Sequence, residues 1–256
     1  MVKSLTVDQQ EILKEQYGKV KARELAKMFN VTINTIYNAA KNLKLTQKLN
    51  PKFKLTDEQH QIILGGILGD GNLKKNGRNY YYRECHAIEE KEYLTWKFEQ
   101  LKNVTTDKIY DIPGRGYSPQ VGFQTKNSET FSKYAAMDKI DVIKNLNELG
   151  FIIWALDDGW YRSNSKIGCY GISRGLLTEE EAHALIEKAA DLGLEMHCIG
   201  SSGDFSLTSV NNFRLKEIAY KYFDKSMDII KKKINKLKVK FIVDSNPLTN
   251  IGKPTV

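Results

Sequence analysis

The sequence predicts an α+β (mixed α/β) fold in which an αββαββα unit occurs twice, behind a small all-α module. Two apolar segments, Ile63–Leu68 and Phe151–Leu156, each run into an Asp-Gly pair, and the aspartates Asp70 and Asp158 lie 88 residues apart. After each segment, strand-like alternation and helical patterns follow in the same order, whereas the first 45 residues show helical patterns only. A duplicated unit of this kind implies a pseudo-two-fold axis.

Three predicted helix starts share the pattern Leu-Thr-x-x-Gln/Glu. In such a capping box, the threonine hydroxyl accepts the third helical N–H while the Gln or Glu side chain returns to the threonine N–H. We therefore expect helices to begin directly after each threonine. The three pairs are Thr6 with Gln9, Thr56 with Gln59, and Thr178 with Glu181.

The N-terminal module, residues 1–45, has the spacing of a helix-turn-helix within Ala22–Leu45. Asn30 occupies the turn, where a positive φ is needed and Asn is the best residue after Gly. Thr32 is the predicted cap of the second helix. The alternative is a plain helical hairpin with a solvated face. The residues expected to face outward, with groups suited to base edges and phosphates, are Asn34, Thr35, Asn38 and Lys41.

Positive charge is concentrated in the same region. The chain has 39 Lys and Arg against 31 Asp and Glu, a net charge of +8, and residues 1–55 hold 11 of the basic residues against 4 acidic ones. An excess of this size in a short module favours a polyanionic partner. Residues 46–54, TQKLNPKFK, are predicted to be a linker.

Residues 55–236 form the two predicted repeats, about 55–145 and 146–236, and residues 237–256 form a C-terminal tail. In each repeat the apolar helix comes first and ends at its aspartate. The further elements expected are β-rich stretches at Tyr80–His86 and Lys166–Ser173, helices at Glu89–Lys102 and Thr178–Leu192, strands at Lys108–Tyr110, Gln120–Thr125, Glu195–Ile199 and Phe205–Thr208, and closing helices from Ser128 and at Asn211–Phe223.

Glycines in the first apolar helix indicate a close contact between helices. Gly65 and Gly69 are four residues apart and leave one helix face bare, although Gly in a helix costs about 1 kcal/mol relative to Ala. The second apolar helix, with Ala155 as a small residue, is the expected partner. Packing of the two helices would bring Asp70 and Asp158 together, and two such carboxylates repel each other unless a hard cation lies between them.

These segments resemble the LAGLIDADG homing endonucleases in their two-motif, single-chain form. Ile63–Gly71 matches the nine-residue motif, and Phe151–Gly159, ending in WALDDG, is similar to a common variant of the second copy. The alternative is two ordinary buried helices that happen to end in Asp-Gly. The second motif departs from the family in having Ile153 where a glycine often stands.

The resemblance implies a saddle of antiparallel strands in the DNA major groove and two or three Mg²⁺ ions, for which Mn²⁺ substitutes. Asp70 and Asp158 would bind the ions, with help from the carbonyl groups of Gly69 and Asp157. The ions would polarise the scissile phosphates, ready a water and stabilise the leaving 3′ oxygen. A catalytic lysine from each half is also implied. By position these are Lys139 and Lys231, with Lys232 an adjacent candidate, or each is only a phosphate contact or a solvated charge.

Candidate DNA contacts lie on the predicted strands and their turns. Residues that face outward from the strands are suited to base readout, and residues in the turns are suited to phosphates or base edges. Two residues near the strand ends could reach the cleavage centre. The alternative for each of them is a solvated strand residue. The three groups are Gln120, Gln124, Ser206 and Thr208; Lys74, Arg78, Arg162 and Lys166; and His86 and Arg174.

The sequence therefore predicts a site-specific, Mg²⁺-dependent double-strand DNA endonuclease, intron-encoded and monomeric. The alternative is a non-cleaving DNA-binding regulator or an intron-RNA maturase on the same scaffold, with host intron RNA as a partner. Three cysteines without a C-x-x-C pair indicate neither a disulfide framework nor a zinc site. Because the start lacks a signal core and no apolar run nears the ~20 residues of a membrane span, we expect a cytoplasmic or organellar protein that is neither secreted nor membrane-bound.

Overall fold

A computed structural model of the chain describes residues 5–18, 20–45, 52–114, 118–163, 168–200 and 203–238. Residues 46–51 of the predicted linker, residues 239–256 of the tail, and Lys166 lie outside the described residues. The chain divides into two compact units. One comprises Met1–Lys54, Lys75–Tyr81 and Asn127–Ala135, and the other comprises Leu55–Lys74, Tyr82–Lys126 and Ala136–Val256.

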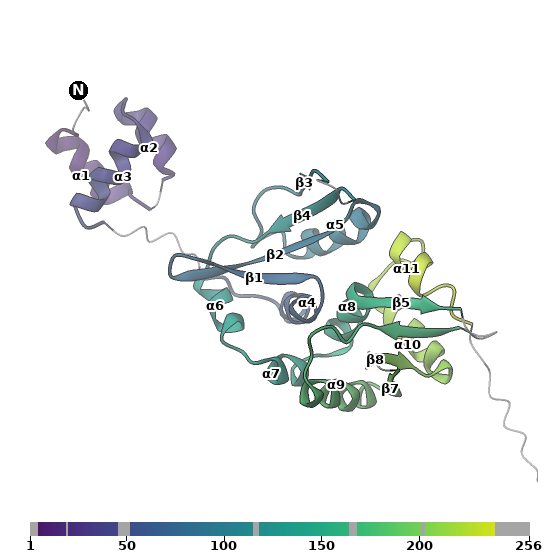
Figure 1. Cartoon of the computed structure of the whole chain (residues 1–256). Helices are drawn as coiled ribbons and strands as arrows, with labels where there is room; N and C mark the ends of the chain where they lie inside the picture. The colour runs from purple at the N-terminus through teal and green to yellow at the C-terminus, as the bar shows by residue number, and fades with distance from the viewer. Residues whose placement is uncertain are drawn as a thin grey trace, which may run out of the picture. The chain divides into compact units, whose positions relative to one another are not determined.

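The N-terminal module consists of the helices α1 (Val7–Gln16), α2 (Ala22–Phe29) and α3 (Ile33–Asn42), drawn in purple in Figure 1. The positive φ predicted for Asn30 is confirmed at 51°, and this residue ends α2. Thr32 caps α3 as predicted, because its hydroxyl accepts the N–H of Thr35 at 3.2 Å. The centre of the small core consists of Leu13, Leu25 and Ile36.

The two repeats follow in chain order. The first contains α4 (Asp57–Leu68), β1 (Gly71–Asn76), β2 (Asn79–Ala87), α5 (Lys91–Gln100), β3 (Tyr110–Ile112), β4 (Gln120–Gln124), α6 (Glu129–Ala135) and α7 (Lys139–Lys144). The second contains α8 (Glu148–Asp158), β5 (Gly159–Arg162), β6 (Cys169–Ile172), α9 (Glu179–Asp191), β7 (Met196–Ile199), β8 (Asp204–Leu207), α10 (Asn212–Tyr222) and α11 (Asp228–Lys233). No helix among the described residues is both long enough and apolar enough to cross a membrane.

Each repeat contains one four-stranded sheet, and the two sheets have the same strand order. The first runs β1-β2-β4-β3 and the second β5-β6-β8-β7. In both, the central strands pair antiparallel, with Cys85 opposite Gly122 in the first sheet and Gly171 opposite Ser206 in the second. The predicted mixed α+β fold, with two antiparallel sheets, is confirmed.

The predicted helix starts are confirmed at all three capping boxes. Thr6, Thr56 and Thr178 each accept the third helical N–H, and the paired Gln or Glu side chain returns to the threonine N–H. Three elements differ from the prediction. Each repeat ends in a further short helix, α7 or α11, and the strand expected at Lys108–Tyr110 is Tyr110–Ile112, where it pairs with β4.

The helices α4 and α8 pack closely through glycine, as the sequence predicted. A Cβ atom added to Gly65 would overlap the carbonyl oxygen of Gly150, and one added to Gly69 would lie 2.5 Å from the Cβ of Asp157. At the other end of the pair, Gln61 donates from Nε2 to the carbonyl of Asn145 at 2.9 Å. The two helices therefore lie side by side, and their C-terminal ends meet at the two motif aspartates.

Candidate active site

The two motif acids stand at the C-terminal ends of the paired helices. Asp70 directly follows Gly69, the C-cap of α4, and its side chain is 40% exposed. Asp158 is the last residue of α8 and is half-buried. Burial, together with the carboxylates of Asp157 and Asp70, raises the pKa of Asp158 to about 7. Burial is the largest cause of this raised pKa, and the two neighbouring carboxylates add to it.

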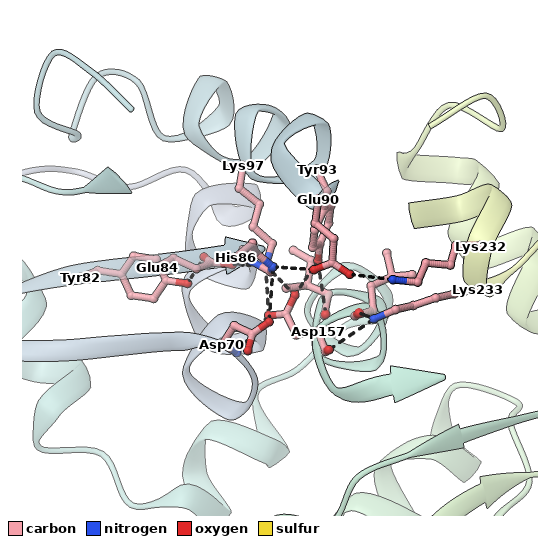
Figure 2. A network of polar contacts seen from close by, with 12 residues as sticks. Asp70, Tyr82, Glu84, His86, Glu90, Tyr93, Lys97, Asp157, Lys232 and Lys233 are labelled. Atoms are coloured by element: carbon pink, nitrogen blue, oxygen red, sulfur yellow. Dashed lines mark hydrogen bonds and ion pairs between the residues drawn. The ribbon is translucent and has the colours of Figure 1, made fainter. Parts of the chain in front are cut away.

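The side chain of Asp157, near the end of α8, contacts the backbone at the end of α4. Its Oδ2 accepts the backbone N–H of Asp70 at 3.3 Å, and its Oδ1 accepts the hydroxyl of Tyr93 at 2.9 Å (Figure 2). Lys97 of α5 donates to both carboxylate oxygens, at 2.7 and 3.0 Å. The Asp157 side chain is fully buried, and burial raises its pKa to about 6 although Lys97 opposes the rise. Asp157 thus ties the ends of the two motif helices together.

A buried ionic network extends from Lys97 along strand β2. The Lys97 ammonium contacts Glu84 as well as Asp157, and both the Lys97 and Glu84 side chains are fully buried. Glu84 also accepts the hydroxyl of Tyr82 at 2.5 Å and lies 2.7 Å from Nε2 of His86. Burial alone would raise the pKa of Glu84, but Lys97 and His86 hold it at about 2. Since a buried charge is costly without a partner, this network is held together by pairing at each member.

His86 lies among three carboxylates. Besides Glu84, its ring contacts Glu90 at 3.2 Å and Asp70 at 3.4 Å, both through Nδ1 (Figure 2). Burial would lower its pKa, but the hydrogen bonds to Glu84 and Glu90 raise it to about 10. The imidazole is therefore a cation at neutral pH, fixed beside the acid of the first repeat.

Two lysines of α11 reach the same region. The buried Lys233 donates to the carbonyl of Leu156 and, at 3.4 Å, to that of Asp157, and burial lowers its pKa. It places an ammonium at the C-terminal end of α8, where the helix dipole favours a cation. Lys232 lies 3.8 Å from Glu90.

The two lysines predicted as catalytic, Lys139 and Lys231, each have a carboxylate partner outside the acid pair. Lys139, at the start of α7, is 4.0 Å from Glu181, and Lys231 pairs with Asp228 at 3.3 Å; both side chains are largely exposed. Lys97 and Lys233 both contact Asp157, which directly precedes the motif acid Asp158. The sequence does contain a hint of the role of Lys97, because this lysine lies on the same face of α5 as the buried Tyr93.

Three predicted DNA contacts are buried, and for Thr35 and Ser206 this contradicts the expected outward position. Thr35 is 8% exposed because its hydroxyl turns back to that of Thr32, 2.9 Å away. Ser206 is 6% exposed, and its strand partner Gly171 has the indole ring of Trp160 against its bare face. His86, expected near the cleavage centre, lies 3.4 Å from the Asp70 carboxylate and is buried.

The other candidate contacts differ in how freely they face outward. Arg174 is engaged with Glu179 and the carbonyl of Leu177, and Thr208 lies 3.3 Å from Glu195. Gln124 and Arg162 are half-buried. The candidates that the structure exposes are Asn34, Asn38, Lys41, Lys74, Arg78 and Gln120.

The chemistry of the donor set fits divalent cations. One oxygen or nitrogen each of Asp70, His86 and Asp157 lie within 4.8 Å of one another. The Asp157 carboxylate is already engaged by Lys97, Tyr93 and the Asp70 N–H, and both His86 nitrogens face carboxylates. Asp70, which contacts His86 with one oxygen, and Asp158 provide two further carboxylates, hard oxygen ligands of the kind that suits Mg²⁺ and Mn²⁺.

A duplicated α+β unit with an acid at the end of each of two close-packed helices defines the scaffold of a two-motif DNA endonuclease. Comparison with known families agrees. Residues 60–199 match the LAGLIDADG DNA endonuclease family, and the chain belongs to this family.

Individual relatives match parts of the chain. The DNA endonuclease I-ChuI of Chlamydomonas applanata is 46% identical over 50 residues, which is 19% of this chain and 23% of that protein. The protein RecA of Mycolicibacterium chitae is 28% identical over 120 residues, 44% of this chain and 28% of that protein. The chain thus spans about a quarter of the length of these relatives. The structure of the homing endonuclease I-WcaI bound to its DNA recognition sequence aligns with a TM-score of 0.58 at 17% identity, over 75% of this chain and 90% of that one, which shows the shared fold.

Proposed function

We propose that this protein is a site-specific, Mg²⁺-dependent endonuclease that cuts both strands of double-stranded DNA at a long asymmetric site. We propose further that it acts as a monomer and as an intron-encoded homing endonuclease. The observation that supports the proposal most strongly is the placement of Asp70 and Asp158 at the meeting ends of two glycine-packed helices in a chain of this family.

Each repeat contributes one acid to the proposed chemistry. Asp70 and Asp158 would hold the divalent ions, with the backbone carbonyls of Gly69 and Asp157 beside them. Bound ions of this kind polarise a scissile phosphate and stabilise the leaving oxygen. Asp157, held by Lys97, keeps the two helix ends together, so that the acids stay at a fixed separation. Lys233 and His86 add fixed positive charge next to the position of a phosphate.

DNA affinity in this proposal comes from groups outside the acid pair. Exposed Lys74, Arg78 and Gln120 belong to the first repeat. The N-terminal helical module and the linker after it, residues 1–55, together hold 11 basic residues against 4 acidic ones. We propose that this module contacts DNA flanking the cleaved site and so lengthens the recognised sequence. Phosphate contacts of this kind make affinity dependent on salt.

The test is to incubate the protein with a plasmid library of random sites, with and without Mg²⁺, and to sequence all new ends. The proposal expects ends at one sequence, with 3′ overhangs, only when the divalent ion is present. Recovery of bound DNA without any cut ends would favour the non-cleaving regulator. Stimulated splicing of a host intron RNA in place of DNA cleavage would favour the maturase.

A further inference from the structure

One face of α3 presents a narrow set of side chains to solvent. Asn34, Tyr37, Asn38 and Lys41 are all exposed and follow the spacing i, i+3, i+4, i+7, which places them on one side of a helix. The opposite side packs into the module's core through residues such as Ile36. Because Thr35 turns inward, the exposed stripe of α3 consists of these four side chains: two asparagines, one tyrosine and one lysine.

The same module exposes more large apolar side chains than the rest of the described chain. Of nine such residues in the described part of the protein, five lie between Val7 and Tyr37, and Tyr37 itself is 47% exposed. Ile33, 38% exposed, lies at the edge of the stripe next to Tyr37. The ring of Tyr37 is exposed between two amide side chains in the most basic part of the chain. Such a surface is typical of one that binds a polyanion bearing apolar groups.

We infer that this face of α3 reads A·T base pairs in the major groove. The inference rests on the proposed function, in which the module contacts DNA flanking the cleaved site. An asparagine amide matches the N7 acceptor and N6 donor of adenine, and an apolar ring matches the methyl group of thymine. Asn34 and Asn38 lie in the first two turns, the part of a recognition helix that meets base edges.

The composition of α3 also argues against guanine readout. Its ten residues, INTIYNAAKN, contain no arginine, the side chain that most often pairs with guanine O6 and N7. Lys41, its only basic residue, lies in the last turn, where a phosphate contact is the natural role. Two adenine-matching amides without an arginine make the face selective for one class of base pair.

The test uses the full chain in Ca²⁺, which supports binding without cutting, and selection of DNA from a random library. We expect enriched sequences to contain a short A·T block separate from the main site. Replacement of that block by G·C pairs should weaken binding about tenfold or more, since one bidentate pair discriminates by about 1–3 kcal/mol. Asn38→Ala should reduce this preference for A·T by a similar factor, with the main site still bound.

Asn42→Ala is the matched control, because Asn42 is exposed on the same helix but is its last residue, one turn beyond the first two turns that meet base edges. It should leave the A·T preference unchanged. A selected site with G·C or no preference in the flank, or equal effects of Asn38→Ala and Asn42→Ala, would overturn the inference while DNA binding itself stood. Failure to select any DNA would contradict the proposed function as well.

Discussion

The two repeats share a backbone but differ in what they bury beside the motif helices. Tyr82 and Tyr170, 88 residues apart like the motif acids, place their hydroxyl groups beside Gly71 and Gly159 in the same way. Two residues further on, Glu84 of the first repeat corresponds to Ile172 of the second. Lys97 on α5 likewise corresponds to the buried Leu185 on α9.

This difference separates the requirements of the fold from those of the site. In the second repeat both corresponding positions hold buried apolar residues, so this fold does not need charges there. The first repeat places a buried Glu-Lys pair in that space, and the lysine reaches Asp157 at the acid centre. Buried ion pairs contribute little net stability compared with apolar packing. We therefore infer that the buried charges of the first repeat are there to hold Asp157, and with it the two motif acids, in place.

The largest effect is expected when Lys97 alone is removed. Lys97→Met would leave Glu84 and Asp157 as buried carboxylates without their shared cation, which costs about 3–5 kcal/mol. At the corresponding position of the second repeat, Leu185→Met should cost less than about 1.5 kcal/mol. Urea unfolding of both variants measures the difference.

A transplant from the second repeat sharpens this comparison. The double variant Glu84→Ile with Lys97→Leu removes one carboxylate together with the ammonium, so it should unfold less readily than Lys97→Met. If Lys97→Met and Leu185→Met lost equal stability, the ionic network would not hold Asp157 as described.

A smaller loss is expected from filling the contact between the two helices. Gly65→Leu improves helix propensity by somewhat under 1 kcal/mol, but the added side chain would collide with Gly150 and Ile153. Overpacking of this kind costs about 1–3 kcal/mol, and a shift near 1 Å at the acids costs about a hundredfold in rate. The measurements are the melting temperature and single-turnover cleavage, with Gly65→Ala expected to lie between the wild type and Gly65→Leu. A Gly65→Leu variant that melts higher and cuts normally would rule out this contact.

The smallest effect concerns acid stability in the second repeat. Glu148 at the start of α8 accepts from Lys221 at 2.6 Å and pairs with Arg214, and these bonds hold its pKa below the ordinary 4.5. Its contribution to stability is therefore present above pH 4.5 and is lost as the pH falls through the lower folded-state pKa. Glu148→Gln should lose less unfolding free energy than the wild type between pH 7 and pH 3.5. Glu89→Gln, at an exposed position, is the control and should behave like the wild type.

Most of the fold could be predicted because its signals are local. Capping boxes at Thr6, Thr56 and Thr178, strand alternation, and the glycine spacing in α4 each depend on residues a few positions apart. The short helices α7 and α11 were missed because six residues give too little periodicity to recognise.

The site was predicted less completely because it depends on contacts between distant segments. The motif acids could be found from their repeat, but the lysine positions were inferred from spacing alone. The structure places the side chain of Lys139, one of these two, 4.0 Å from Glu181 of α9, a contact that spacing could not predict. Lys97 reaches Asp157 across 60 residues of sequence, and only the packed structure brings them together.

The central claim is that one acid from each repeat serves cleavage and not binding. Cleavage of a supercoiled plasmid carrying the selected site, with each strand labelled, tests it directly in Asp70→Asn and Asp158→Asn. Both variants should fail to make double-strand breaks in Mg²⁺, while their affinity in Ca²⁺ stays within about tenfold of the wild type, because affinity comes from many phosphate contacts. Asp191→Asn, the same change at an exposed aspartate at the end of α9, should cut normally. Full double-strand cleavage by either aspartate variant would contradict the account.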